Sequence, residues 1–272
     1  MDPFSVDAYT PAEIARRLEK ISMSKCTVDP LRVFALALLA GAFIALGAAF
    51  FTLVTYDVGN MPAGLMRLIG GLAFCLGLIL VVVAGAELFT GNNLLVMACI
   101  DGLISIRQLI YNWVMVYLGN FIGALGILLL MYFSGLWWQG DGALGQKVVA
   151  IADSKVNMSW MEAFSRGVLC NILVCLAVWL CMAGRSVTDK VLAVIFPITA
   201  FVALGFEHSV ANMFFIPAGL LAQTEIGTTL AVSEQLTIGG FFWHNLIPVT
   251  LGNMLGGSVF VGLFYWFIYL RK

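Results

Sequence analysis

The sequence predicts an all-α membrane protein in which six transmembrane helices form two inverted three-helix repeats, with interrupted second and fifth helices. Composition is the first observation behind this prediction. The chain is 61% hydrophobic and 11% charged, whereas ordinary soluble domains have about 45–50% apolar and about 25% charged residues. Length is the second, because a span takes roughly 20 apolar residues and 272 residues hold about six. The third is a motif that both halves share.

Residues 1–30 are expected to form a cytoplasmic amphipathic segment. Thr10, Pro11 and Glu13 have the spacing of a capping box that starts a helix. Apolar and basic residues then alternate at helical spacing: Ile14, Leu18 and Ile21 against Arg16, Arg17 and Lys20. We expect this helix to lie on the membrane, where it either anchors the first span or takes part in gating.

Apolar runs place the spans within a single transmembrane domain over 31–272, with repeats at about 31–136 and 164–270. The six expected spans are 31–56, 68–83, 106–136, 167–183, 187–204 and 241–270. The second is interrupted at 85–93 and resumes at 94–100, and the fifth is interrupted at 205–212 and resumes at 213–221. Residues 137–166 form the one sizeable polar connection.

The two interruptions carry one motif, G-x-E-x-x-x-x-N, at 85–92 and 205–212, and the following spans share G-N-x-x-G at 119–123 and 252–256. With three spans per half, the second copy enters the membrane from the opposite side, so the breaks meet near the midplane. Small residues would let the helices pack closely: Gly41, Gly47, Gly119, Gly123, Gly252 and Gly256. The distribution of basic residues predicts that both termini are cytoplasmic.

Non-helical backbone at bilayer depth is tolerated where it lines a cavity, so the breaks predict a solute pathway. Each is expected to start a half-helix, near Asn92 and Asn212, whose unpaired amides favour an anion. His208 stands there with Thr90, and an ionisable residue at this depth indicates function. The histidine could attract an anion as imidazolium or deliver it as the neutral acid. Glu87 and Glu207 would repel an anion, so we interpret them as supports that hold their loops through backbone or lysine hydrogen bonds.

Residues 85–91 read GAELFTG and residues 205–213 read GFEHSVANM. These segments resemble the two signature loops of the formate/nitrite transporter family. Residues 213–219, MFFIPAG, and 245–253, NLIPVTLGN, resemble its formate-channel branch. The resemblance covers essentially the whole chain. It implies an aquaporin-like protomer with its own pore, a homopentamer, and a bacterial-type cytoplasmic (inner) membrane as the location.

The resemblance also implies roles for individual residues. Thr90 and His208 match the family's central selectivity pair. Four residues match its apolar constrictions: Leu78, Leu88, Phe89 and Phe201. Others match positions that line the pore or support the loops: Asn171, Val174, Asn212, Lys155, Glu207 and Glu87. The implied function is a pH-sensitive channel for formate and similar small monovalent anions. Proton coupling through the central histidine is part of what the resemblance implies. Membrane lipid would surround the protein. Nitrite and hydrosulfide are the alternative substrates.

Other functional classes fit less well. An aquaporin-type channel for water or glycerol would carry Asn-Pro-Ala, but Asn93 follows Asn92 and Met213 follows Asn212. An intramembrane serine protease would need Ser258 as nucleophile and His208 as base, yet Ser258 lies in an apolar run among packing glycines. A net charge of −1 offers no basic surface for nucleic acid. We expect no enzyme activity, no catalytic residue, no metal and no cofactor.

Overall fold

The structure, a computed structural model, describes residues 8–59, 61–226 and 232–271, and within these ranges it is helical without strands. Five long apolar segments could cross a membrane: 30–55, 63–85, 106–133, 160–183 and 238–269. They are α2 (Pro30–Thr55), α3 (Ala63–Leu80) with η1 (Val81–Gly85), α6 (Ile106–Phe133), α8 (Trp160–Ala183) and the run from α11 to α13. The shorter α9 (Val187–Ala203) corresponds to the expected fifth span at 187–204. The prediction of an all-α membrane protein is confirmed.

The second and fifth spans are broken at a glycine, as predicted. The chain takes a left-handed conformation at Gly85 (φ 81°) and at Gly205 (φ 74°), which glycine adopts without a side-chain clash. It restarts as α4 (Phe89–Asn92), η2 (Asn93–Leu95) and α5 (Val96–Ile100) in the first half, and as α10 (Ser209–Ile226) in the second. The predicted starts near Asn92 and Asn212 are wrong by most of a turn, because Phe89 and Ser209 already begin these helices.

The N-terminal helix α1 (Pro11–Thr27) has the predicted capping box, with the Thr10 amide donating to the Glu13 carboxylate at 2.8 Å. Its place on the membrane stays a prediction, and its apolar face packs on the protein. Ile14 and Leu18 are buried in a cluster with residues of α8 and α13. The helix is therefore packed against the ends of the transmembrane helices.

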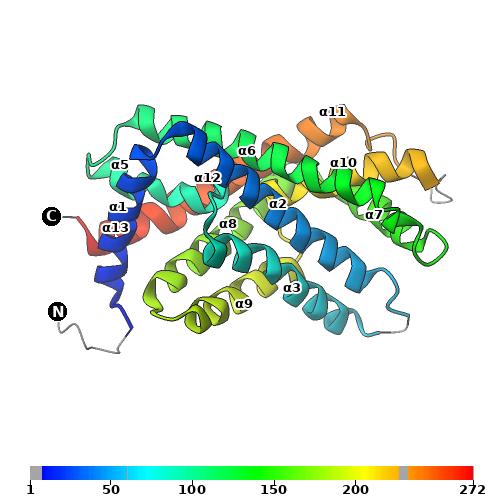
Figure 1. Ribbon diagram of the computed structural model, residues 1–272, viewed down its shortest axis with the longest axis horizontal. Coiled ribbons are helices and arrows are strands. Elements are labelled where there is room, and N and C mark those ends of the chain that lie inside the picture. Colours follow the sequence, from blue (N-terminus) through cyan, green and yellow to red (C-terminus); the bar gives the residue numbers. More distant parts are fainter. Residues whose placement is uncertain (1–7, 60, 227–231, 272) are drawn as a thin grey trace.

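A second short helix, α7 (Ala143–Val156), lies in the connection that was expected to be only polar. Its position before α8 corresponds to that of α1 before α2. Figure 1 shows α1 and α13 at the left end of the molecule and α7 at the right end. The two short helices thus cover opposite mouths of the helix bundle.

The last span is continuous but not a regular α-helix. It passes through α11 (Ile238–Gly240), η4 (Phe241–Leu246), α12 (Ile247–Leu255), η5 (Gly256–Leu263) and α13 (Phe264–Tyr269), of which η4 and η5 are π-helical. The third span is shorter than predicted, because α6 ends at Phe133 and is followed by the 3₁₀ turn η3 (Leu136–Trp138).

Glycines bring α6 against α2 and α12 against α8. A Cβ atom added at Gly123 would lie 2.0 Å from the Leu38 carbonyl oxygen, and one at Gly252 would lie 2.2 Å from that of Phe164. Both obstacles are backbone atoms that cannot rotate away. These two positions therefore require glycine, as the sequence predicted for close helix packing.

We expect Gly123→Ala to destabilise the fold by about 3 kcal/mol, because overpacking against backbone forces whole helices apart. The measurement is the melting temperature of the purified protein in detergent. Gly126→Ala is the matched control on the same helix, since a Cβ at Gly126 meets nothing within 4 Å. Equal melting temperatures for the two variants would contradict the packing argument.

Candidate functional site

Two asparagines fix the backbone of the break loops from the neighbouring helices. The Asn120 side chain of α6 donates to the carbonyl oxygens of Ala37 and Glu87 and accepts from the amide of Phe89. The Asn253 side chain of α12 does the same for the other loop: it donates to Gly167 and Glu207 and accepts from Ser209. We did not single out these asparagines from the sequence, although the shared G-N-x-x-G motif was their signal.

These bonds also correct the expected anion site at the half-helix ends. The Phe89 and Ser209 amides already donate to the side chains of Asn120 and Asn253, and the Ala211 amide donates to His208. One amide at the start of α4 and two at the start of α10 are therefore engaged within the protein, which weakens the anion site expected there.

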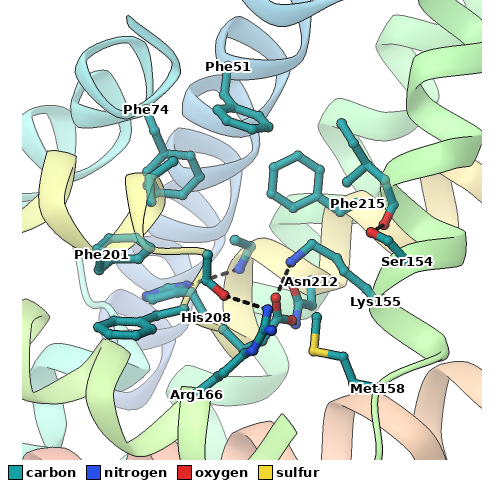
Figure 2. Close-up of a pocket in the computed structure, with 16 residues that line it drawn as sticks. Phe51, Phe74, Ser154, Lys155, Met158, Arg166, Phe201, His208, Asn212 and Phe215 are labelled. Atoms are coloured by element: carbon teal, nitrogen blue, oxygen red, sulfur yellow. Dashed lines mark hydrogen bonds and ion pairs between the residues drawn. The ribbon is translucent and has the colours of Figure 1, made fainter. Parts of the chain in front are cut away.

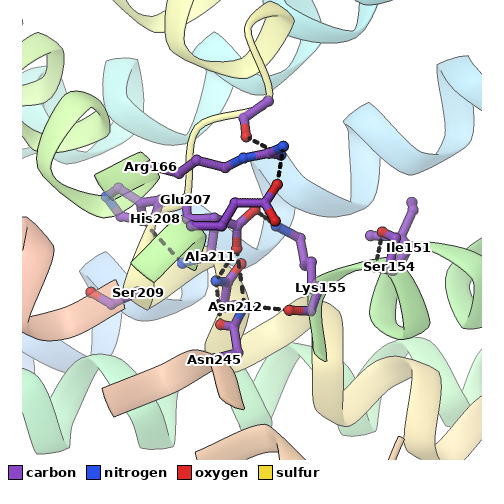
Figure 3. A network of polar contacts seen from close by, with 12 residues as sticks. Ile151, Ser154, Lys155, Arg166, Glu207, His208, Ser209, Ala211, Asn212 and Asn245 are labelled. Atoms are coloured by element: carbon purple, nitrogen blue, oxygen red, sulfur yellow. Dashed lines mark hydrogen bonds and ion pairs between the residues drawn. The ribbon is translucent and has the colours of Figure 1, made fainter. Parts of the chain in front are cut away.

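The carboxylate of Glu207 is buried and fully engaged (Figure 3). Lys155 of α7 donates to it at 2.7 Å, and the side-chain amides of Asn212 and Asn245 donate at 2.7 and 3.1 Å. Asn212 also donates to the Asn245 side-chain oxygen at 2.6 Å. The expected bond to a lysine is present. Asn212 was expected to line the pore or support the loop, whereas Asn245 was not foreseen as a partner of Glu207.

Glu87 has the same surroundings at the other mouth. Lys25 of α1 donates to its carboxylate at 3.0 Å and to the Asn92 side-chain oxygen at 2.7 Å. Asn92 donates to Glu87 at 2.7 Å and to Asn112 at 2.9 Å. Each break loop thus carries a carboxylate whose charge is balanced by one lysine from a short covering helix.

Thr90 and His208 join the two break loops. The Thr90 hydroxyl oxygen and His208 Nε2 are 3.0 Å apart, and both residues are buried. The Ala211 amide donates to His208 Nδ1 at 3.0 Å, so Nδ1 is an acceptor and carries no proton. The ring is therefore neutral, its proton sits on Nε2, and it donates to Thr90. No other acceptor binds the Thr90 hydroxyl among the described residues, which leaves its hydrogen for a solute.

Two cavities flank this pair. The α7-side vestibule, about 220 Å³, is lined by His208, Lys155, Arg166 and aromatic rings (Figure 2). The α1-side vestibule, about 340 Å³, is lined by Lys25, Leu78, Leu88 and residues of α1 and α8. Each vestibule therefore presents a lysine beside apolar walls. Neither the aromatic wall at Phe51, Phe74 and Phe215 nor Arg166 was foreseen from the sequence.

Three of the four expected constriction residues lie at the inner ends of the vestibules. Leu78 and Leu88 line the α1-side vestibule, and Phe201 lines the α7-side vestibule. Phe201 stacks on the His208 ring at 6.0 Å between centroids and meets Phe74 edge-on at 5.5 Å. The ring of Phe89, the fourth, packs on Tyr117 of α6 at 4.8 Å and lines neither vestibule, so its place at a constriction stays a prediction.

The remaining predicted residues lie on α8. Asn171 donates to the carbonyl oxygens of Thr90 and Asn253 and to the Asn93 side chain, while its own side-chain oxygen has no partner among the described residues. Val174 is buried one turn further along and lines neither vestibule. Asn171 thus holds the Thr90 loop in place.

The serine considered as a protease nucleophile is engaged elsewhere. The Ser258 hydroxyl donates to the Asn93 carbonyl oxygen at 3.4 Å, whereas His208 is bound to Thr90 and Ala211. A nucleophile must lie within hydrogen-bond reach of its base. The described residues therefore contain no Ser258 and His208 dyad.

A multi-pass helical protein with a buried polar pair between two vestibules is a membrane channel or transporter for small solutes, not an enzyme. Comparison with known proteins identifies the group. The chain belongs to the formate/nitrite transporter family, whose model matches residues 12–267.

Similar proteins share nearly the whole length. The formate channel FocA of Escherichia coli strain K12 is 44% identical over 279 residues, covering 100% of this chain and 97% of the relative. Formate channel FocA of Haemophilus influenzae is 43% identical, covering 94% and 93%. A solved pentameric formate channel with formate bound superposes with a TM-score of 0.80 at 41% identity, covering 89% of this chain and 98% of that one.

Proposed function

We propose that this protein is a channel for formate and similar small monovalent anions, with His208 and Thr90 as its selectivity pair. The observation that carries the proposal is the hydrogen bond between these residues, at 3.0 Å, between two vestibules that each contain a lysine. Similarity to the formate channels supports formate as the substrate.

The geometry gives each part a task. Lys155 and Lys25 present N–H donors to a solute in the vestibules, and their ion pairs with Glu207 and Glu87 hold them in place. Leu88 and Phe201 then replace water by apolar surface, which a hydrated ion cannot cross without losing its shell. The Thr90 hydroxyl offsets part of this desolvation by donating to the carboxylate of formate.

Proton coupling is part of the proposal. The empty site holds a neutral ring, because protonation of Nδ1 would break the bond from the Ala211 amide. A formate anion beside Nε2 favours the charged ring and offsets the cost of that bond. Nδ1 then takes a proton from the vestibule, Nε2 gives its proton to formate, and formic acid leaves. The proton that stays on the ring moves from Nδ1 to Nε2 through water, which restores the resting tautomer and its bond from the Ala211 amide. One proton moves with each formate, because the ring takes up the extra proton only when the anion is present.

Assembly and orientation belong to the same proposal. The solved relative is pentameric, which supports a homopentamer with one pathway in each protomer. The matched bonds of Asn120 and Asn253 support two inverted repeats. Basic residues of α1 support cytoplasmic termini in a bacterial-type cytoplasmic membrane, with α7 outside. Native mass spectrometry in mild detergent should show five chains, and an active monomer would contradict this assembly.

Flux into proteoliposomes tests the function. Formate, nitrite, hydrosulfide and chloride are compared, with and without a pH gradient that is acid outside. We expect formate to move fastest and its uptake to rise with the gradient. Faster nitrite or hydrosulfide transport would reassign the substrate within the family, and rapid swelling in glycerol would favour a neutral-solute channel.

We further propose that α1 confers pH sensitivity through Glu19. This side chain is buried on α1, and one of its carboxylate oxygens has no partner among the described residues. Burial raises the pKa of Glu19 to about 7, the carboxylate of Asp101 adds to the rise, and Arg16 opposes it. Asp101 accepts a hydrogen bond from Trp266 of α13, so both acids lie where α1 meets the bundle. A raised pKa stabilises docking at acid pH, and this stabilisation is lost as the pH rises through about 7.

The expected result is that α1 exchanges its amide hydrogens faster at pH 8 than at pH 6, after correction for intrinsic rates. Glu19→Gln removes the charge and should keep exchange slow at both values. Lys20→Gln, exposed on the same helix, is the control and should behave like the wild type. Equal pH dependence in wild type and Glu19→Gln would contradict the role of Glu19, and α1 would then act as an anchor.

A further inference from the structure

A side pocket of about 200 Å³ opens beside the α7-side vestibule. It shares the wall residues Phe51, Val202 and Gly205 with that vestibule, so the two spaces adjoin. In Figure 2, Phe51 lies at the edge of the vestibule that is farthest from Arg166. The pocket is therefore a neighbour of the vestibule, and the mechanism above makes no use of it.

Two cations that have no partner among the described residues line this pocket. Arg67 of α3 and Lys147 of α7 both contribute to it, and no aspartate or glutamate does. The salt bridges among the described residues involve Lys25, Lys155 and Arg166, and neither Arg67 nor Lys147 takes part in one. Arg67 is exposed, whereas Lys147 is half-buried. Partial burial lowers the pKa of Lys147, since a desolvated ammonium group without a counter-ion is disfavoured.

A half-buried cation is usually paired, because burial of an isolated charge is costly. Here a second cation lines the same pocket, which adds repulsion. An anion between the two would neutralise both charges. The remaining walls are mostly apolar, Phe51, Met66 and Val202 among them. The one other polar side chain in the lining is Thr55, whose hydroxyl donates to the Phe51 carbonyl oxygen at 2.8 Å.

We propose that Arg67 and Lys147 form a second anion-binding site that captures a small monocarboxylate before it enters the vestibule. The inference rests on the proposed function, because its ligand is the permeating substrate. Arg67 would hold the carboxylate with two parallel N–H donors and Lys147 with one. The captured anion would then pass along Phe51 toward Lys155 and His208.

Uptake kinetics in proteoliposomes of uncharged lipid test the site. Arg67→Gln and Lys147→Gln should each raise the formate concentration for half-maximal uptake about threefold to fivefold, the effect of one partly screened charge. The maximal rate should not change, because neither residue lies at the selectivity pair. Arg67→Lys and Lys147→Arg keep the charge and should stay near the wild-type value. Lys190→Gln, a half-buried cation in the first turn of α9 like Lys147 in its degree of burial, is the control at the other mouth.

The double variant distinguishes a shared site from a general field. If both side chains hold one anion, the effect of the double variant is smaller than the product of the single effects. If the effect of the double variant equals the product of the two single effects, the cations only attract anions from a distance, and the site is rejected. A lower maximal rate with unchanged half-saturation would also reject it.

Chemical protection tests the site without transport. Formate should slow the reaction of Lys147 with an amine-reactive reagent in the wild type, and Arg67→Gln should abolish this protection. If the wild type shows no formate flux but formate still protects Lys147, the proposed function is rejected and the site is kept. Normal flux without protection would reject the site alone. An effect that appears only in vesicles containing anionic lipid would assign the pocket to a lipid headgroup and overturn the proposal.

Discussion

Replacing His208 with phenylalanine is expected to lower formate flux about 10- to 100-fold and to abolish uptake driven by a pH gradient. The substitution removes the ring nitrogen that donates to Thr90 and the one that accepts from Ala211. Loss of a buried hydrogen bond to a charged group costs about 1.5–3 kcal/mol, and 1.4 kcal/mol is a factor of ten. The measurement is formate flux in proteoliposomes from pH 5 to pH 8.

Two conservative variants separate the parts of this effect. His208→Asn keeps a neutral donor and should retain passive flux without coupling to the gradient, because an amide does not take up a proton at these pH values. Thr90→Ser keeps the hydroxyl and should behave like the wild type, whereas Thr90→Val should lose flux. Proton-coupled uptake that survives in both His208→Phe and His208→Asn would show that the ring carries no proton and only packs.

Phe201→Ala is the second large prediction, and it concerns selectivity. The Phe201 ring closes the α7-side vestibule over His208 and rests on Phe74. Its removal should widen the passage and raise acetate flux relative to formate about tenfold, which is the low end of what one extra carbon costs in a tight apolar site. Leu88→Ala should act in the same direction from the α1-side vestibule.

The control is chosen from the same helix. Phe196 of α9 is 77% exposed, so Phe196→Ala removes an equal volume away from the pathway and should leave the ratio of acetate to formate unchanged. Phe89→Ala makes a further contrast, because its ring faces Tyr117 and should affect stability more than selectivity. Equal flux ratios in wild type, Phe201→Ala and Leu88→Ala would show that these side chains only pack.

The helical class and the approximate spans could be predicted from the amino-acid sequence alone, because an apolar run of about 20 residues indicates a transmembrane helix. The sequence also determined the two breaks. Gly85 and Gly205 stand where an L-side chain would oppose the left-handed backbone, so the interruption is encoded locally. His208 was conspicuous for the same reason: an ionisable residue within apolar sequence is costly and therefore informative.

The hydrogen-bond partners of the polar residues could not be predicted from the sequence and are seen only in the folded protein. Asn120 and Asn253 take the amides that the helix starts were expected to offer to an anion, and they come from helices far along the chain. The direction of the Phe89 ring followed from the position of Tyr117 rather than from its own neighbours. A side chain's direction and a hydrogen bond across helices depend on packing between segments, about which a one-dimensional pattern says little.

The same reason applies to the short helices and to the protonation of the pore. The helix α7 was not predicted, because it lies in a polar stretch of the sequence. Its contacts bring Lys155 to Glu207 and Lys147 to the side pocket. From the sequence, His208 could be an imidazolium or a proton donor, and the bond from Ala211 to Nδ1 decides for a neutral resting ring. Charge state is set by burial, by nearby charges and by hydrogen-bond partners, and these are brought together only by folding.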